Sequence, residues 1–352
     1  MANYFKKSYI MEGINLYLIR FILSFFRSRF IPKGKVLIKS CDGIGDILVR
    51  TKLVEKIIQK YGEENIYFLM QKGYVGIGDI LGYKSIGFSR EDRKSFFKRL
   101  KKMYELNTMG FSTYINLEFT NDITSGNLFI PERIGRIDTN WKVSRNNKYY
   151  TKSYFLEDGY VLDQVRKMAE YILGEKISKE EILPDLRDRF SVTKEDIVVA
   201  VGSTEKTRVC SPVIMDEYLR IILNKYPDKK IKLVGNGARQ NAYAEKLKSM
   251  LSDDRVENLV DRTTLKEVFE IVSTSYLFIG FESGLYNLCF SLRKNGIILF
   301  KEESGAFLHK EHWLNLIYPK EIRQDIVDPE YPGLGINSIS IQDFKNALDF
   351  KG

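Results

Sequence analysis

The stretch KVLIKSCDGIGDIL, residues 35–48, holds the pattern that decides the fold. Its first five residues form a short apolar run, which predicts a β-strand at 35–39. Gly43 and Gly45 then permit a tight turn, and apolar residues recur with helical spacing through 47–60. A strand, a glycine turn and a helix in this order are typical of a parallel α/β sheet.

The same alternation continues along the chain. A polar, highly charged segment at 177–196, which contains Pro184, is typical of a linker between domains. We therefore expect a two-domain α/β protein, with two Rossmann-like parallel-sheet domains at 35–188 and 189–352 facing across a cleft and a C-terminal helix that could pack back on the first domain. The other predicted strands are 66–70, 113–117, 196–201, 230–235, 255–260, 276–280 and 296–300, and the other predicted helices are 91–106, 160–173, 212–225, 238–251, 264–273 and 283–293.

Residues 1–34 form a separate N-terminal segment with an apolar helix predicted across 14–30. The helix is too short for a membrane span and carries Arg20 in its middle, and no cleavage site for a signal peptide follows it. Two interpretations stay open. The aromatic residues beside Arg20, Arg27, Arg29 and Lys33 suit a helix lying peripherally in an anionic membrane interface. The helix could equally be buried against the body of the protein or a second subunit.

The chain has 352 residues and a net charge of +9, which favours acidic partners such as nucleotide phosphates or anionic lipids. We expect no nucleic acid partner, because no nucleic-acid-binding motif is present. The three cysteines, Cys41, Cys210 and Cys289, are far apart and predict neither a disulfide framework nor a zinc site. These features indicate a cytoplasmic protein, which could lie on the inner face of the cell membrane.

Three loops that follow predicted strands carry residues suited to chemistry, and ligands bind at such strand ends in α/β sheets. In the first loop Asp46 opens a helix, where it could cap the helix or face the cleft as a catalytic carboxylate. The second loop, VGSTEKTRVCSP at 201–212, offers Ser203, Thr204 and two cations, Lys206 and Arg208. The third, GFESGLYNL at 280–288, would point the amides of Ser283 and Gly284 at an anion.

Other candidate motifs are weak. The hexapeptide GIGDIL occurs twice, at 43–48 directly after a predicted strand and again at 76–81. The second copy lies several residues past the nearest strand, so we treat it as a coincidence. His309 and His312 make a poor metal site without a third ligand, and we expect them at the surface or lining the cleft. No metal site is predicted.

The chain resembles glycosyltransferase family 9, the heptosyltransferase-like enzymes of bacterial lipopolysaccharide and surface-glycan assembly. The resemblance covers roughly residues 35–350. It rests on Gly45-Asp46 after the first strand, on ERIGRID at 132–138, which is similar to the family's R-I-G segment after the mid-domain strand, and on residues 258–292. The last stretch is similar to the family's N-L-x-G-x-T-x-L-x-E run and the donor motif D-[ST]-G-x-x-H-L that follows it.

This resemblance implies a GT-B fold with an N-terminal acceptor domain and a C-terminal nucleotide-sugar donor domain. It implies an inverting, metal-independent enzyme that moves a sugar, for example a heptose, from a nucleotide-diphosphate sugar to a surface glycan, a lipopolysaccharide-type or lipid-linked acceptor, or a protein. Asp46 would be the general base, and no cofactor is implied. The donor and its phosphates would contact Gly45, Ser203, Thr204, Lys206, Arg208, Glu282, Ser283, Gly284 and Asn287.

The sequence also departs from the family pattern. Glu282 and Asn287 stand where the donor motif has aspartate and histidine, and R-V-C-S-P at 208–212 replaces K-x-W-P, which leaves Lys206 and Arg208 as rival phosphate-binding cations. A catalytically silent subunit that binds a glycan or a nucleotide-sugar is therefore the alternative hypothesis. A nicotinamide-dependent oxidoreductase is disfavoured, because the first turn lacks G-x-G-x-x-G.

Overall fold

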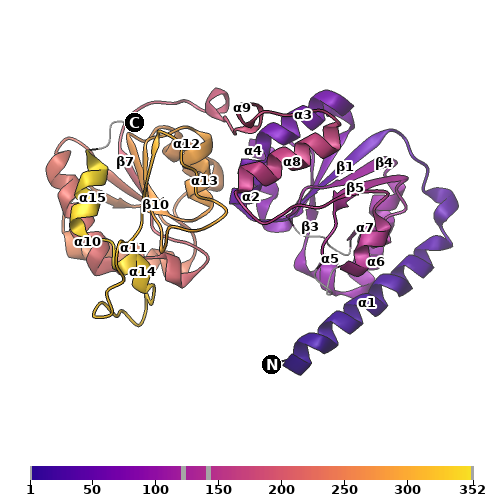
Figure 1. Ribbon diagram of the computed structural model, residues 1–352, viewed down its shortest axis with the longest axis horizontal. Helices are drawn as coiled ribbons and strands as arrows, with labels where there is room; N and C mark the ends of the chain where they lie inside the picture. Colours follow the sequence, from indigo (N-terminus) through magenta and orange to yellow (C-terminus); the bar gives the residue numbers. More distant parts are fainter. Residues whose placement is uncertain (1, 120–123, 140–143, 350–352) are drawn as a thin grey trace. The chain divides into compact units, whose positions relative to one another are not determined.

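The structure, a computed structural model, describes residues 2–119, 124–139 and 144–349. The chain divides into two compact units, each made of segments that are not contiguous in sequence (Figure 1). Unit 1 consists of Met1–Gly43, Leu53–Asp158 and Gln164–Glu181, and unit 2 consists of Ile44–Lys52, Gly159–Asp163 and Ile182–Gly352. Ile44–Lys52 thus belongs to unit 2, although its place in the sequence put it in the first domain.

Each unit contains a six-stranded sheet in which every described strand pair is parallel. The order in unit 1 is β3-β2-β1-β4-β5-β6, and the order in unit 2 is β12-β11-β10-β7-β8-β9. The strands are β1 (Lys35–Ser40), β2 (Ile66–Gln71), β3 (Ser85–Phe88), β4 (Phe111–Asn116), β5 (Glu132–Arg136), β6 (Lys152–Tyr154), β7 (Ile197–Ala200), β8 (Ile231–Val234), β9 (Val256–Asn258), β10 (Leu277–Phe281), β11 (Gly296–Leu299) and β12 (Leu314–Ile317).

The two sheets share one topology, since both read 3-2-1-4-5-6 when the strands are counted from the start of each unit. This is the doubly wound Rossmann order, which reverses direction between its first and fourth strands. Ligands bind at that reversal, beyond the carboxyl ends of the strands. In unit 2 the reversal lies between β7 and β10, so the loops that follow these two strands mark the expected binding position. The expected fold of two Rossmann-like parallel sheets is confirmed.

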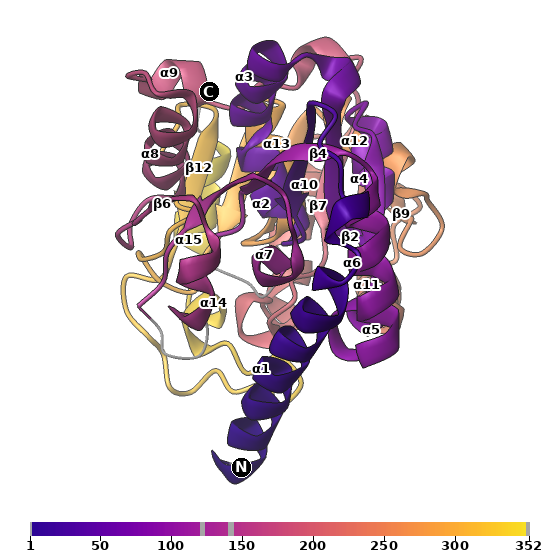
Figure 2. The same ribbon diagram turned by 90° about the vertical axis from the view of Figure 1, so that its right-hand side faces the viewer.

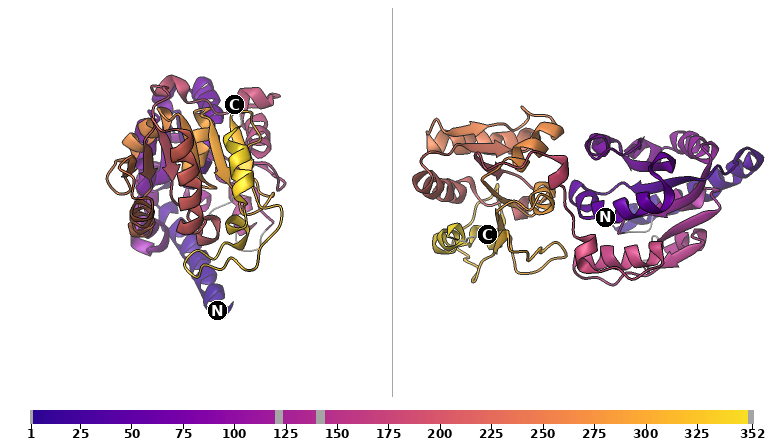
Figure 3. Two further views of the ribbon diagram at one scale, coloured as in Figure 1. Left: turned by 90° about the vertical axis from the view of Figure 1, so that its left-hand side faces the viewer. Right: turned by 90° about the horizontal axis from the view of Figure 1, so that it is seen from above.

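Helices pack on both sides of each sheet (Figure 3). The strand and helix periodicities of the sequence explain most of them, because buried parallel strands read as continuous apolar runs and the covering helices carry one apolar stripe. The helices are α1 (Ala2–Ser24), α2 (Ile44–Val49), α3 (Thr51–Tyr61), α4 (Val75–Ile80), α5 (Arg90–Lys94), α6 (Phe96–Thr108), α7 (Thr124–Asn127), α8 (Val161–Leu173), α9 (Lys179–Ile182), α10 (Pro212–Lys225), α11 (Ala238–Leu251), α12 (Leu265–Ser273), α13 (Gly284–Ser291), α14 (Leu334–Asn337) and α15 (Ile341–Leu348).

Some elements differ from the expected ones. The helix expected at 91–106 is two helices, because Ser95 between α5 and α6 has an extended conformation with ψ 126°. The helix expected at 47–60 is likewise divided at Arg50 into α2 and α3. The segment ERIGRID was expected to follow a strand, and most of it is itself strand β5.

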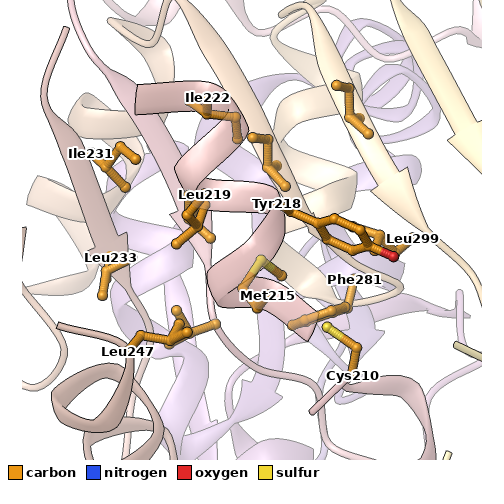
Figure 4. Close-up of a cluster of buried hydrophobic side chains, with 14 of the residues drawn as sticks. Cys210, Met215, Tyr218, Leu219, Ile222, Ile231, Leu233, Leu247, Phe281 and Leu299 are labelled. Atoms are coloured by element: carbon orange, nitrogen blue, oxygen red, sulfur yellow. The ribbon is translucent and has the colours of Figure 1, made fainter. Parts of the chain in front are cut away.

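The core of unit 2 lies between its sheet and the helices α10, α11 and α15 (Figure 4). The rings of Tyr218 in α10 and Phe344 in α15 stack with centroids 4.2 Å apart, and the Tyr218 hydroxyl donates to the Ile339 carbonyl at 2.8 Å. The C-terminal helix α15 therefore packs on α10 within unit 2. A phenol that ends on a backbone carbonyl satisfies its polar group inside an apolar core.

The N-terminal helix α1 lies along unit 1 beside α6 and α7, and its first turns extend past the other elements of that unit (Figure 2). Leu16, Ile19 and Leu23 are fully buried on one side of α1, so the interpretation as a packed helix holds for this face. Arg20 also points inward, where it donates to the Gly126 carbonyl at 2.7 Å. The sequence predicts Arg20 among the cations that face a membrane. That expectation was wrong, because its guanidinium packs on two aromatic rings, those of Phe129 and Tyr149.

Candidate functional site

The candidate site in unit 2 begins with the close packing of α2 on α13. Two glycines make this approach possible. A Cβ added at Gly45 would lie 2.6 Å from the side-chain nitrogen of Asn287, and one added at Gly284 would lie 2.9 Å from Cβ of Ile44. No real side chain tolerates such distances, so glycine at 45 and 284 brings the helix that carries Asp46 against the helix of the third loop.

Asp46 is the third residue of α2, and its side chain is partly exposed. It therefore does not occupy the N-cap position, which precedes the first helical residue. The backbone carbonyl of Asp46 accepts a hydrogen bond at 2.7 Å from the buried Arg50 side chain, one turn further on. This bond fixes the turn of helix on which the carboxylate stands.

The loop after β7 is anchored to the loop after β10 through Ser203. Ser203 is buried and donates from its hydroxyl to the Glu282 carbonyl at 2.9 Å. Its own carbonyl accepts a hydrogen bond from Arg239, at the start of α11, at 2.5 Å. The structure thus brings the second and third predicted loops together at the topological reversal of the sheet, while Thr204 lies exposed.

The two rival cations of the second loop have different surroundings. The Arg208 guanidinium is 3.1 Å from a carboxylate oxygen of Glu205 and 3.3 Å from one of Glu282. Lys206 is exposed and makes no ion pair within the described ranges. Of the two, Lys206 is the cation available to a ligand, and Arg208 holds the loop in place.

Burial raises the pKa of Glu282 above the ordinary glutamate value, although the Arg208 charge opposes the shift. Arg208 therefore faces a carboxyl group that loses its proton at a higher pH than an ordinary glutamate does. A ligand hydroxyl that accepts or donates hydrogen bonds would meet no large excess of negative charge here.

A small pocket opens beside this loop, at the carboxyl ends of β7 and β8. Two of its residues, Lys206 and Arg239, are cationic, and two, Tyr243 and Tyr331, are aromatic. Such a combination places positive charge beside aromatic side chains. The lining residues are Val201, Gly202, Lys206, Val209, Arg239, Gln240, Tyr243 and Tyr331.

The third loop leads into α13 with Ser283 at the N-cap, where its hydroxyl accepts from the Tyr286 amide. Asn287, one turn later, is buried, and its side-chain nitrogen donates to the Ser283 carbonyl at 3.0 Å. Its side-chain oxygen is 3.0 Å from Nε2 of His309. Asn287 therefore holds the loop in place, and both the nitrogen and the oxygen of its side-chain amide have hydrogen-bonding partners.

His309 is fully buried, contrary to the expectation of a surface or cleft-lining residue. Its ring stacks on Phe290 with centroids 3.7 Å apart, and Nδ1 lies 3.1 Å from the Tyr160 hydroxyl. His309 and Arg239 are the two residues of this region that sequence reasoning missed. Arg239 could have been found, because it follows the strand predicted at 230–235 and strand ends were the stated criterion. Nothing local to the sequence HKEHW indicates that His309 reaches Asn287.

Across the described parts of the chain, no three His, Cys, Asp or Glu side chains gather as a metal site would require. The three cysteines are buried and form no disulfide with one another, and burial raises the pKa of the Cys210 thiol to about 12. The positive charge near the two loops comes from side chains and from the amino end of α13.

Comparison with known proteins gives one match by sequence. The chain is 24% identical over 158 residues to lipopolysaccharide heptosyltransferase 1 of Campylobacter coli. The match covers 44% of this chain and 42% of that protein, so it spans well under half of the relative's length. No family model matches the chain.

Solved structures agree over most of the chain. The E. coli heptosyltransferase WaaC with ADP-2-deoxy-2-fluoro heptose superposes with a TM-score of 0.70 over 90% of this chain and 99% of that one, at 15% identity. The chain has the fold of glycosyltransferase family 9. A family 9 glycosyl transferase from Veillonella parvula matches with a TM-score of 0.68 over 90% of this chain and 96% of its own, at 14% identity.

A third structure, the E. coli ADP-heptose lps heptosyltransferase II, gives a TM-score of 0.69 over 90% of this chain and 97% of that chain, at 14% identity. The resemblance to family 9 is thus confirmed by one sequence match and several structure matches. The chain shares its fold with heptosyltransferase structures, and the WaaC structures were solved with ADP or with an ADP-heptose analogue. At these identities the superpositions establish the fold, and the roles of individual residues rest on the geometry described above.

Proposed function

We propose that this protein is an inverting, metal-independent glycosyltransferase that transfers a sugar, a heptose in the first instance, from a nucleotide-diphosphate donor. The acceptor would be a bacterial surface glycan, most simply of the lipopolysaccharide type and lipid-linked, and a protein acceptor is the other possibility. The observation that carries the proposal is the packing of α2 on α13, which holds Asp46 beside the loop that follows β10.

In this mechanism the Asp46 carboxylate takes the proton of the acceptor hydroxyl as its oxygen attacks the anomeric carbon. The new C–O bond forms on the face opposite to the breaking bond, and the configuration at that carbon inverts. The electron pair of the breaking bond leaves with the nucleoside diphosphate. The proton ends on Asp46, and the negative charge ends on the diphosphate.

Three groups would stabilise the departing diphosphate. Lys206 and Arg239 line one pocket and supply two positive charges, and the amino end of α13 at Ser283 and Gly284 adds a partial positive charge. The partly exposed ring of Tyr331 in the same pocket would contact the base. Glu282 would contact the sugar or the ribose, held by Arg208.

Asp46→Asn tests the role of the general base. The amide keeps the shape of the carboxylate but cannot accept the proton, so we expect unchanged donor binding and a loss of turnover of about 10²–10⁴-fold. Turnover would be measured with ADP-heptose and a purified acceptor. Asp79→Asn is a matched control, since Asp79 lies in the second GIGDIL copy, in α4, and is exposed.

Two results would contradict the proposal. Turnover of Asp46→Asn within a few-fold of the parent would mean that Asp46 has only a structural role. Donor binding by the parent without transfer to any tested acceptor would favour the silent binding subunit, which the departures at Glu282 and Asn287 suggest.

A further inference from the structure

Helix α1 has a second apolar face, which unit 1 leaves uncovered. Its side chains recur every three or four residues and are about half exposed or more, up to 61% at Phe21 and 70% at Phe25. We call this set the docking face. It consists of Ile14, Tyr17, Leu18, Phe21 and Phe25. The opposite face, with Leu16, Ile19 and Leu23, is fully buried, so α1 is apolar on both sides and only one side has a partner within unit 1.

Cations border the docking face. Arg27, Arg29 and Lys33 follow it in sequence and are exposed. Lys148, from a different part of unit 1, joins it in space, because its ammonium lies 3.2 Å from the Tyr17 hydroxyl. No Asp or Glu occurs anywhere between residues 13 and 41.

Exposed aromatic and aliphatic residues bordered by lysine and arginine are the pattern of a helix that lies in a membrane interface. The apolar side chains enter the boundary between headgroups and acyl chains, and the cations meet the phosphates. A second copy of the chain fits less well, because two docking faces brought together would also bring their uncompensated cations together.

We propose that the docking face of α1 binds the surface of an anionic lipid bilayer and attaches unit 1 to it. Arg20 has no part in this contact, since it is bound to Gly126 on the inner side. The inference is independent of the transferase proposal, because it concerns a face of α1 in unit 1 and uses none of the candidate site residues.

The test is cosedimentation of the full-length protein with vesicles made of equal parts phosphatidylcholine and phosphatidylglycerol, compared with vesicles of phosphatidylcholine alone. We expect the parent to pellet with the anionic vesicles only. Phe21→Ser/Phe25→Ser should lower its partitioning at least tenfold, because the two most exposed rings of the docking face are lost. Arg27→Gln/Arg29→Gln should lower it by roughly fivefold for each charge, and added salt should have the same effect.

The control is Ile322→Ser/Val327→Ser, which removes two exposed apolar side chains from unit 2 and should bind vesicles like the parent. All four positions of the apolar variants are exposed, so their melting temperatures should match that of the parent. Equal pelleting of the parent and of Phe21→Ser/Phe25→Ser would overturn the proposal. A second outcome would also overturn it: the parent does not bind the vesicles, forms an oligomer in solution, and the oligomer dissociates in Phe21→Ser/Phe25→Ser. That result would assign the docking face to a contact with a second copy of the chain.

Discussion

The buried contact between His309 and Asn287 shows how a departure from the family motif is accommodated. Where the resemblance implies a histidine, Asn287 packs directly under Gly45, with its side-chain nitrogen 2.6 Å from the position that a Cβ on that glycine would take. An imidazole is still present, but it comes from a distant loop and contacts the asparagine from the other side. The hydrogen-bonded pair of Asn287 and His309 fixes the position of the loop. The titratable imidazole therefore does not occupy the space beside Gly45.

His309→Ala should therefore destabilise unit 2. The substitution leaves a cavity against Phe290 and an unsatisfied oxygen on Asn287, and we expect a loss of about 2–5 kcal/mol in the free energy of unfolding. Denaturant titration would measure it. His312→Ala is the control, because His312 is exposed and should change stability by less than about 0.5 kcal/mol. Equal effects of the two variants would contradict the buried role.

The ion pairs of the second loop separate the roles of its two cations. Lys206→Gln should weaken binding of ADP by roughly ten- to a hundredfold, because a charged hydrogen bond is worth ~1.5–3 kcal/mol. Arg208→Gln should weaken it less and lower stability, since Arg208 already pairs with Glu205 and Glu282. Asn287→Ala should also lower stability more than affinity. Calorimetric titration of the three variants decides this, and normal binding by Lys206→Gln would mean that the loop is only a solvated turn.

Much of the candidate site was accessible from the sequence, because strand ends in a parallel sheet converge on one edge. That rule selected Asp46, Ser203 and Ser283 without any contact information, whereas Glu282 entered through the resemblance to the family motif. It does not reveal which of two neighbouring cations is already paired, because ion pairs such as Arg208 with Glu282 join residues far apart in sequence. The contact of His309 with Asn287 could not be predicted for the same reason, because these residues are also far apart in sequence.

The contact between α2 and α13 depends on two helices approaching more closely than ordinary side chains allow. Gly45 and Gly284 face each other's helix, and Asn287 takes up the remaining space. Asp46 is adjacent to Gly45, so any outward shift of α2 moves the carboxylate away from the third loop. The precision of the proposed reaction thus depends on the smallest residues of the site.

Gly45→Ala should lower turnover without removing any chemical group. A methyl group at this position collides with Asn287, and such overpacking costs about 1–3 kcal/mol of stability. Gly76→Ala is the matched control, since it makes the same change in the second GIGDIL copy, where a Cβ would meet nothing within 4 Å. We expect Gly76→Ala to be neutral or slightly stabilising, and steady-state kinetics with thermal melting would compare the two. A fully active Gly45→Ala would show that α2 can shift freely.

Elements with a long apolar pattern were predictable, and short or interrupted ones were not. Strands β3, β5, β6 and β12 were missed because each has only three to five residues and at least one exposed or partly exposed position. Short strands are defined by their neighbours in the sheet more than by their own composition. The break between α5 and α6 was missed because no glycine or proline marks it, and the extended conformation of Ser95 cannot be read from its neighbours in sequence.

The stability of the whole protein should depend on pH through a buried lysine remote from the candidate site. Lys294 is buried and donates to the Thr193 carbonyl at 2.6 Å, and burial lowers its pKa from 10.5 to about 8. Between these values the unfolded chain binds a proton that the folded chain does not, so folding becomes more favourable as pH rises from about 8 to 10.5. Below pH 8 the charge must be buried in the folded state.

Lys294→Gln should remove this slope. As pH rises through that interval, the unfolding free energy of the parent is expected to increase relative to that of the variant. Denaturant titrations at several pH values would measure the two free energies. Lys194→Gln, which removes an exposed neighbour, should keep the slope of the parent. A parent and Lys294→Gln that respond identically to pH would mean that Lys294 keeps its proton when folded.

The division of the chain into interleaved units has a consequence for its synthesis on the ribosome. Helix α2 leaves the ribosome early, but its partner α13 is made only after most of the chain has emerged. Until then Ile47, Leu48 and Val49, which are buried in the finished protein, have no cover from that helix. A nascent chain that has completed the sheet of unit 1 therefore still lacks the cover of α13 over α2, and the first element of the candidate site to be translated is among the last to reach its final place.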